Sequence, residues 1–168
     1  MSMAQWASAF AESALGLTKS VGDLAGACLF ATTMGISRML YGKFGEKIDL
    51  IKFMLVSGVI CVVSYLLAGL SAMPIWGLVG CVMCGFSVGI MWPGSISITA
   101  PRIPKGGTAL FALLAMAGDM GGAFGPSVVG YFSQHAGDNL QAGLLTGCIF
   151  PLIMLATLIA VKKMTPEG

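Results

Sequence analysis

The sequence predicts an all-α fold, a bundle of transmembrane helices that crosses the membrane several times. Of its 168 residues, 57% are hydrophobic and only 10% are charged, and the mean hydropathy is +0.90. A soluble globular domain has about 25% charged residues, so polar side chains this scarce cannot cover its surface, and lipid must solvate much of it. The apolar residues are also grouped into stretches of about 20, the length that a helix needs to cross a bilayer. We therefore predict an integral, multi-pass membrane protein.

Five apolar stretches have the length of a membrane span, and short polar loops separate them. In chain order, the predicted spans are Gly22–Tyr41, Ile51–Leu70, Ile75–Ile98, Thr108–Phe132 and Leu144–Val161. The Pro101–Gly107 loop has two prolines and a glycine pair, through which no helix continues, and Lys162 and Lys163 stop the fifth span. Residues 1–20 hold an apolar stretch too short to span, and we expect the outer end of a truncated helix with its connecting loop. Residues 21–168 then form a five-helix bundle.

The basic residues predict the orientation of the spans, because loops on the cytoplasmic side carry an excess of Lys and Arg. If the Gly42–Leu50 loop is cytoplasmic, eight of the nine basic residues lie on or near that side, and Lys19 alone lies opposite. The eight are Arg38, Lys43, Lys47, Lys52, Arg102, Lys105, Lys162 and Lys163. The C-terminus is therefore predicted to be cytoplasmic, in a cytoplasmic (inner) or plasma membrane, and the Ser133–Gly143 loop to face outside.

The fourth predicted span is rich in glycine and holds a proline. Gly118 and Gly122 form one GxxxG pair, Gly121 and Gly125 form a second, and Pro126 follows directly. Small residues at this spacing let helix backbones approach closely in lipid, and a proline inside a helix removes a backbone donor and loosens the helix. The pattern predicts a closely packed helix that can bend. Helix packing alone and a gating role explain it equally well.

Asp119 lies near the middle of the same span. A charged carboxylate at that depth costs roughly 2.5–3.5 kcal/mol on insertion scales, so its side chain is expected to face protein or a water-filled cavity. One interpretation places Asp119 on the substrate or ion pathway, where it responds to a proton or cation or contacts a polar solute. The other makes it a structural hydrogen-bonding group for neighbouring helices.

The third predicted span is interrupted by Trp92, Pro93 and Gly94. Broken helices at membrane depth expose backbone polar groups and tend to line cavities. Trp92 offers a stacking surface for a ring-shaped solute, although a packing or interfacial tryptophan fits the same pattern. Gly85 and Gly89 precede the break and form a further small-residue pair for packing or gating. Hydroxyls able to contact a solute follow it, at Ser95, Ser97 and Thr99.

Polar groups also occur near the start of the chain, at Gln5, Trp6 and Glu12. In an otherwise apolar segment they suggest a cavity or the outer mouth of a pathway, and we include Gln5 and Trp6 among the candidate pathway residues. A solvated helix end explains them equally well.

The sequence lacks the residues that several classes of function require. The net charge of +2 and the absence of a basic stripe argue against nucleic acid as a partner. No HExxH or GxSxG motif occurs, and the lone His135 is in a predicted outer loop, so we expect no enzyme. Cys81 and Cys84 form a CxxC without a second pair or a histidine pair, which favours packing over a redox or metal site. No cofactor or metal is predicted.

The Gly35–Lys47 segment resembles the short signature that joins two consecutive helices in each half of major facilitator superfamily transporters. In that signature a glycine precedes an acidic residue by four positions, and a basic residue, a second glycine and more basic residues follow. Lys43, Gly45 and Lys47 match it. Three positions depart from it: Arg38 stands for the first glycine, Gly42 for the acid and Glu46 for a basic residue.

A second feature is similar to the same family. Gly122–Pro126, followed by Gly130, resembles the Gly-Pro motif of the family's fifth helix, here on its pseudo-symmetric counterpart, the eleventh. The five spans would be helices eight to twelve, and residues 1–20 would be the outer end of helix seven. The chain would then be a partial C-terminal half of the fold that lacks the N-terminal transporter helices.

The resemblance implies a secondary transporter whose two six-helix halves rock around a central site. Its implied partners are the lipid bilayer, a small-molecule solute and a coupling proton or cation. The candidates for its cavity and gate are Trp92, Pro93, Asp119, Gly125 and Pro126. The hydroxyls and tryptophan of helix ten favour a sugar, a sugar derivative or another small metabolite as solute. The alternative is a drug/proton antiporter, and from another class a non-transporting five-span subunit or assembly factor.

Overall fold

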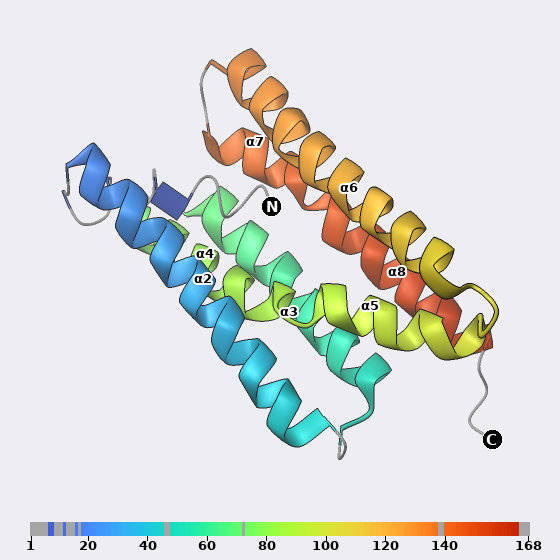
Figure 1. Cartoon of the computed structure of the whole chain (residues 1–168). Helices are drawn as coiled ribbons and strands as arrows, with labels where there is room; N and C mark the ends of the chain where they lie inside the picture. The colour runs from blue at the N-terminus through green and yellow to red at the C-terminus, as the bar shows by residue number, and fades with distance from the viewer. Residues whose placement is uncertain are drawn as a thin grey trace.

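The computed structural model describes residues 7–8, 12, 16, 18–45, 48–71, 73–137 and 140–164, and its regular elements are all helical. The all-α fold predicted from the composition is confirmed. In chain order the elements are α2 (Lys19–Phe44), α3 (Leu50–Leu70), α4 (Pro74–Val88), α5 (Met91–Thr99), the 3-10 helix η2 (Ala100–Arg102), α6 (Gly107–His135), α7 (Leu140–Gly147) and α8 (Ile149–Met164) (Figure 1).

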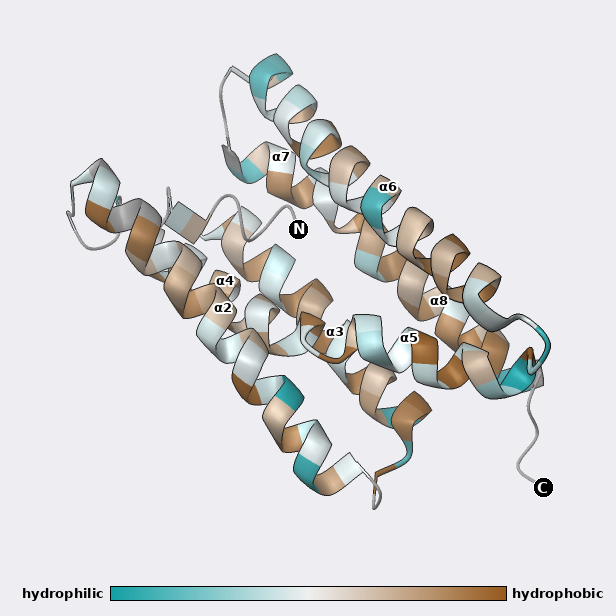
Figure 2. Ribbon diagram, in the orientation of Figure 1, coloured by the Kyte–Doolittle hydropathy of each residue, from teal (hydrophilic) through white to brown (hydrophobic). Residues whose placement is uncertain are grey.

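Five helical segments of the described chain are long and apolar enough to cross a membrane. They are Leu24–Phe44, Leu50–Leu70, Ile75–Arg102, Gly107–His135 and Gln141–Lys163. These segments match the five predicted spans in order. Hydrophilic residues lie mainly at helix ends and loops, but α2 and α6 each have a hydrophilic band within the helix (Figure 2). The end of α2, the start of α3, η2, the start of α6 and the end of α8 lie toward one end of the bundle (Figure 1), as alternating spans require.

The third span is two helices, because α4 ends at Val88 and α5 begins at Met91. The break therefore falls at Gly89 and Ile90, just before the position predicted from the sequence. Pro93 explains the offset. A proline has no N–H, and its ring clashes with the carbonyl four residues earlier, so the helix is disturbed at Gly89 rather than at the proline itself.

The fifth span shows the same offset, which we did not predict. Its two helices, α7 and α8, meet at a turn at Cys148, three residues before Pro151. Leu152 resumes the helical pattern by donating its N–H to the Cys148 carbonyl at 3.3 Å. By contrast, α6 runs without interruption through Pro126.

Helix α3 lies at the centre of the packing, with α4, α5, α7 and α8 around it. One buried cluster joins α2, α3, α4, α6 and α7. Its members on these helices are Phe30, Cys61, Tyr65, Ala68, Leu78, Cys81, Cys84, Val129 and Leu144. A smaller cluster of Met54, Ile90 and Leu158 joins α3 to α8 and to the α4–α5 break.

Glycines bring α4 against α2. A Cβ atom at Gly85 would lie 2.7 Å from the Phe30 carbonyl oxygen, and one at Gly89 would lie 2.7 Å from that of Met34. These distances are too short for any side chain, so both positions need glycine for the close approach. The Thr33 hydroxyl lies within hydrogen-bond distance of the Val82 carbonyl of α4, at 3.1 Å, and of the Leu29 and Phe30 carbonyls of its own helix, both at 3.0 Å.

Candidate functional site

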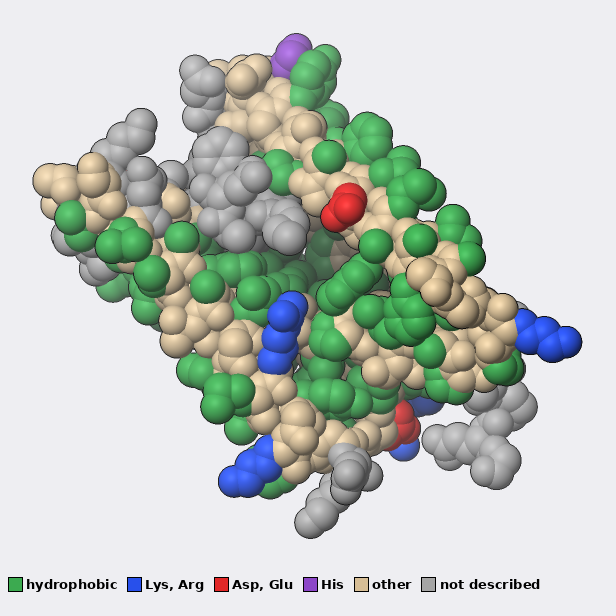
Figure 3. Space-filling view, in the orientation of Figure 1, with side chains coloured by type: hydrophobic (Ala, Val, Ile, Leu, Met, Phe, Trp, Pro, Cys, Tyr) green, Lys and Arg blue, Asp and Glu red, His purple; other side chains and the backbone are tan. Residues whose placement is uncertain are grey.

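A cavity of about 290 Å³ opens between α2, α5 and α6. Its lining residues are Arg38 from α2, Trp92 from α5, and Ala115, Gly118 and Asp119 from α6. Figure 3 shows the face of the molecule that is hollowed between α2 and α6. The cavity thus brings together two predicted pathway residues, Asp119 and Trp92, from helices far apart in the sequence, and adds a guanidinium to them.

Arg38 is positioned by the break between α4 and α5. Its Nε donates a hydrogen bond to the Gly89 carbonyl oxygen at 3.0 Å. In a continuous helix the backbone N–H of residue 93 would donate a hydrogen bond to this oxygen, but Pro93 has no N–H. The proline therefore frees a carbonyl inside the bundle, and a charged donor from α2 takes it. The bond directs the guanidinium toward α5 and the cavity.

Trp92 lies against the backbone of α6. A Cβ atom at Gly118 would lie 2.9 Å from the ring atom Cζ3 of Trp92, so this glycine makes room for the indole. The side chain of Trp92 is still 42% exposed. One part of the ring thus packs on α6, while the rest forms a flat apolar wall of the cavity.

Asp119 is exposed on α6 and lines the cavity beside Gly118. The ion pair found among the described residues, Lys52 with Asp49, is at the start of α3 and not in the cavity. In the described part of the chain the Arg38 guanidinium and the Asp119 carboxylate lie more than 4.0 Å apart, and they do not form a salt bridge. A basic and an acidic side chain therefore border one cavity without a direct salt bridge between them.

The other glycines of α6 have different surroundings. A Cβ atom added at Gly121 would meet no atom within 4 Å, whereas Gly125 is buried. Gly122 is half-buried, and Pro126 lies inside the uninterrupted helix. Their assignment to packing or gating therefore stays a prediction. Gly85 and Gly89 pack α4 against α2, and only a gating role for them stays a prediction.

The predicted loop motif is largely helical. Gly35, Arg38 and Lys43 lie on α2, and Gly45 is its C-cap residue, whose N–H donates to the Tyr41 carbonyl. Arg38 lies within the span rather than in the loop. Three predicted residues lie outside the described part of the chain: Gln5, Trp6 and Lys47.

The hydroxyls of α5 do not share the cavity with Trp92. Ser95 and Thr99 line a separate cavity of about 140 Å³ between α3, α5 and α8. Both hydroxyls donate to backbone carbonyls of their own helix, at 2.7 Å in each case. The tryptophan and these hydroxyls therefore do not form one polar and aromatic surface.

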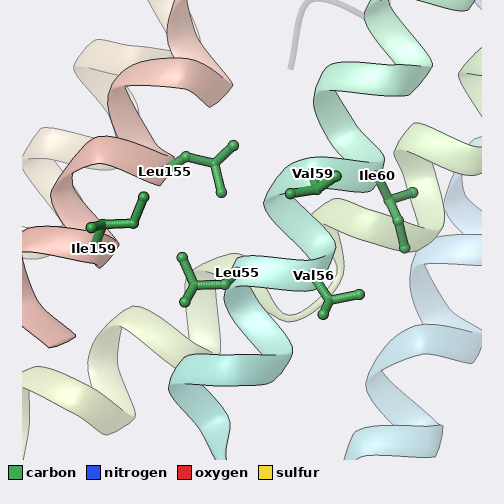
Figure 4. Close-up of a pocket in the computed structure, with 6 residues that line it drawn as sticks. All are labelled: Leu55, Val56, Val59, Ile60, Leu155 and Ile159. Atoms are coloured by element: carbon green, nitrogen blue, oxygen red, sulfur yellow. The ribbon is translucent and has the colours of Figure 1, made fainter.

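A larger cavity of about 430 Å³ lies between α3 and α8, where every lining side chain is aliphatic (Figure 4). It is lined by Leu55, Val56, Val59, Ile60, Leu155 and Ile159. It has no group that could recognise a polar solute or carry a proton. Such a groove on the surface of a span is suited to lipid acyl chains, so we do not place the functional site there.

The two cysteines whose thiols face each other are not the two cysteines of the CxxC motif. The Sγ atoms of Cys61 on α3 and Cys84 on α4 lie 3.8 Å apart, both buried, and neither forms a disulfide. Cys81 is also buried in the same cluster. Their surroundings are those of small side chains that fill the interface between α3 and α4.

Arg38 lines the cavity, although we predicted it only as part of the loop motif. The sequence contained a usable signal, because Arg38 lies inside the apolar stretch rather than after it, and ionisable residues within spans tend to face the bundle interior. What the sequence does not contain is the acceptor, since the Gly89 carbonyl becomes free only through the proline break 51 positions along the chain.

The helices and this cavity define a multi-pass helical membrane protein with charged and aromatic groups gathered between its spans. The sequence model of the Major Facilitator Superfamily matches residues 1–168, and the chain belongs to this superfamily of membrane transporters. The family resemblance noted in the sequence is thereby confirmed.

Two curated relatives are both named "Multi-drug resistance efflux pump PmrA" and come from two strains of Streptococcus pneumoniae, TIGR4 (serotype 4) and R6. Each is 28% identical over 159 residues, which cover 89% of this chain and 39% of the relative. The chain thus spans about two fifths of the length of the relatives it matches. No solved structure matches it significantly.

Proposed function

We propose that the chain is the C-terminal part of a secondary transporter that moves a small, largely apolar aromatic solute by alternating access, with Asp119 as the proton-coupling group. The observation that carries this proposal is the cavity between α2, α5 and α6, which gathers Asp119, Trp92 and Arg38. The family membership supports transport in general. The N-terminal helices of the transporter would close the cavity from the side that α2 and α6 border.

The arrangement of α5 favours an aromatic or drug-like solute over a sugar. A sugar site needs several hydrogen-bonding groups beside the stacking ring, yet Ser95 and Thr99 line a different cavity from Trp92. The two curated relatives are named as multi-drug resistance efflux pumps, which also favours a drug-like solute over a sugar. We therefore place the drug/proton antiporter, the alternative in the sequence analysis, ahead of the sugar transporter.

Asp119 fits the coupling role by its position. Its carboxylate borders the cavity and is exposed, so a proton or a solute can reach it once water enters from one side. Intramembrane carboxylates that face water-filled cavities are typical of proton relays in transporters. By the positive-inside rule we further propose that the C-terminus is cytoplasmic and that the cavity opens near the cytoplasmic end of α2.

The test is a chimera in which this chain replaces the matched segment of the PmrA pump. Efflux of two aromatic dyes, the cation ethidium and the carboxylate fluorescein, is followed in cells at several pH values. We expect the chimera to export at least one dye, and Asp119→Asn to abolish export or remove its pH dependence at unchanged membrane abundance.

Asp49→Asn is the matched control, because it removes a carboxylate outside the spans and should leave export intact. Export by the Asp119→Asn chimera with an unchanged pH profile would exclude Asp119 as the coupling group. If the chimera is abundant in the membrane but exports neither dye, the chain is a non-transporting subunit instead.

A further inference from the structure

We infer that Arg38 is a solute-binding residue that holds an oxyanion, a carboxylate or a similar group, while Trp92 stacks on the aromatic body of the same solute. The inference deepens the proposed function and rests on it for the identity of the ligand as transported solute. It assigns to Arg38 a role that its place in the loop motif does not suggest.

Among the described residues, none occupies the two terminal NH₂ groups of Arg38, which are thus available to a ligand. A guanidinium has five N–H donors, and the hydrogen bond from Arg38 to the Gly89 carbonyl uses the donor on Nε. The two terminal NH₂ groups form the fork that binds carboxylates through two parallel hydrogen bonds. Because Nε is anchored on Gly89, the fork is held in a fixed place at the wall of the cavity, and binding loses little side-chain entropy there.

Two simpler roles for Arg38 do not fit the contacts. A side chain that only snorkels would extend toward the membrane surface, whereas Arg38 bonds a carbonyl on the neighbouring helix, inside the bundle. A structural ion pair would place its guanidinium on Asp119, yet the two groups lie more than 4.0 Å apart within the described residues. The space between them is the cavity itself, which leaves room for a ligand.

The other walls define the rest of the ligand. Trp92 contributes a partly exposed indole, and Gly118 keeps the α6 backbone close behind it. A planar aromatic group fits against this wall. Arg38 is the basic side chain among the residues that line the cavity, so the site selects an aromatic solute with a single oxyanion directed at Arg38.

The inference is tested by binding to the full chain in phosphatidylcholine nanodiscs. Replacing Trp6 and Trp76 by phenylalanine leaves Trp92 as the single tryptophan. The probes are 4-nitrobenzoate and 4-nitrobenzamide, which have the same quenching ring and differ in the carboxylate. We expect 4-nitrobenzoate to quench Trp92 with about tenfold tighter affinity than the amide, the size of effect of a hydrogen bond to a charged group.

Variants of Arg38 separate recognition from folding. Arg38→Gln can still donate to the Gly89 carbonyl but has no charge, and it should bind both probes equally. Arg38→Lys keeps the charge without the fork and should retain only part of the preference. Equal binding of the two probes by the unaltered chain, or a preference that survives Arg38→Gln, would overturn the inference, as would absence of quenching by either probe.

The outcomes are independent of the dye-export test. The binding assay needs no other half of a transporter, so oxyanion recognition by a chain whose chimera exports nothing would refute the transport proposal alone. Conversely, dye export combined with equal binding of the two probes would refute the oxyanion site alone.

Discussion

Asp49 shows how one exposed side chain begins a span. It is the N-cap of α3, and its Oδ1 accepts hydrogen bonds from the backbone N–H groups of Ile51 and Lys52, at 3.0 and 3.2 Å. These donors have no partner within the helix, so the cap satisfies them. The bond from the Lys52 backbone N–H and, next, the contact of the Lys52 side chain with Oδ2 at 3.2 Å hold the pKa of Asp49 below its usual value.

We predict that the stabilising effect of the Asp49 cap depends on pH. Because its pKa is lowered in the folded state, the charged cap stabilises the fold above the unfolded pKa of about 3.9 and loses this effect as pH falls through the lower folded value. Asp49→Ala should lower the melting temperature of the chain in detergent at pH 7, with a smaller difference at pH 3.

Asp49→Asn is the matched control, since asparagine caps helices about as well without titrating. It should melt close to the unaltered chain at pH 7 and show no loss that is specific to acid. If Asp49→Ala and the unaltered chain melt together at pH 7, the cap contributes nothing measurable.

At the scale of helices, α4 packs closely on α2 because the contact positions on α4 are glycines, which have no side chain. We predict that Gly85→Ala lowers the free energy of unfolding by about 1–3 kcal/mol, the usual range for overpacking. The added Cβ would lie 2.5 Å from the Thr33 Oγ1 and 2.7 Å from the Phe30 carbonyl oxygen, and the carbonyl can move away only if the helices separate. Denaturant unfolding in detergent, followed by helical circular dichroism, measures the change.

The control is Gly35→Ala on α2, where an added Cβ meets nothing within 4 Å. Alanine is also the better helix former by about 1 kcal/mol in water. This variant should therefore be as stable as the unaltered chain or slightly more stable. Equal stability of Gly85→Ala and Gly35→Ala would mean that the two helices are not held at this distance.

The elements themselves were predictable, because each span depends on local composition. The five apolar stretches and the loop at Pro101–Gly107 reappear as predicted, whereas α8 runs through Lys162 and Lys163 to Met164. The break in the third span was displaced, since a proline acts on the carbonyl four residues before it. The turn at Cys148, shortly before Pro151, follows the same rule.

The site was only half predictable, because its parts come from three helices. Asp119 and Trp92 stand out as a charge and an aromatic ring within apolar stretches, and both line the cavity. The place of Arg38 depends on how α2 packs against α4, which no local pattern contains. The same holds for Ser95 and Thr99, which the sequence grouped with Trp92 and the structure separates from it.

At the scale of the whole molecule, the spans are unequally covered. In their most apolar windows, half of the residues of the third span are buried and 44% of those of the second, but only 17% on α2 and none on α6. These two helices flank the cavity. Each of these helices packs mainly on one neighbour, α2 on α4 and α6 on α7, and leaves a second face uncovered by the described residues. We expect the remaining helices of the proposed transporter to pack against that face.

This expectation predicts a difference in cysteine labelling between the chain alone and the PmrA chimera. Ala123 is exposed and lies four residues after Asp119, on the same face of α6. With the exposed Cys28 replaced by serine, and the cysteines of the pump portion likewise, Ala123→Cys should react with N-ethylmaleimide in the isolated chain and be protected in the chimera. Ile103→Cys, in the exposed loop between η2 and α6, serves as the control and should react at the same rate in both. Equal labelling of Ala123→Cys in the two settings would mean that the partner helices do not cover this face, and the cavity would then open to lipid rather than to a second half. Protection of both positions would indicate a general loss of access instead of a docking surface. Selective protection of Ala123→Cys is therefore the result that places the helices of the pump portion against α6, where they would close the cavity around Arg38, Trp92 and Asp119.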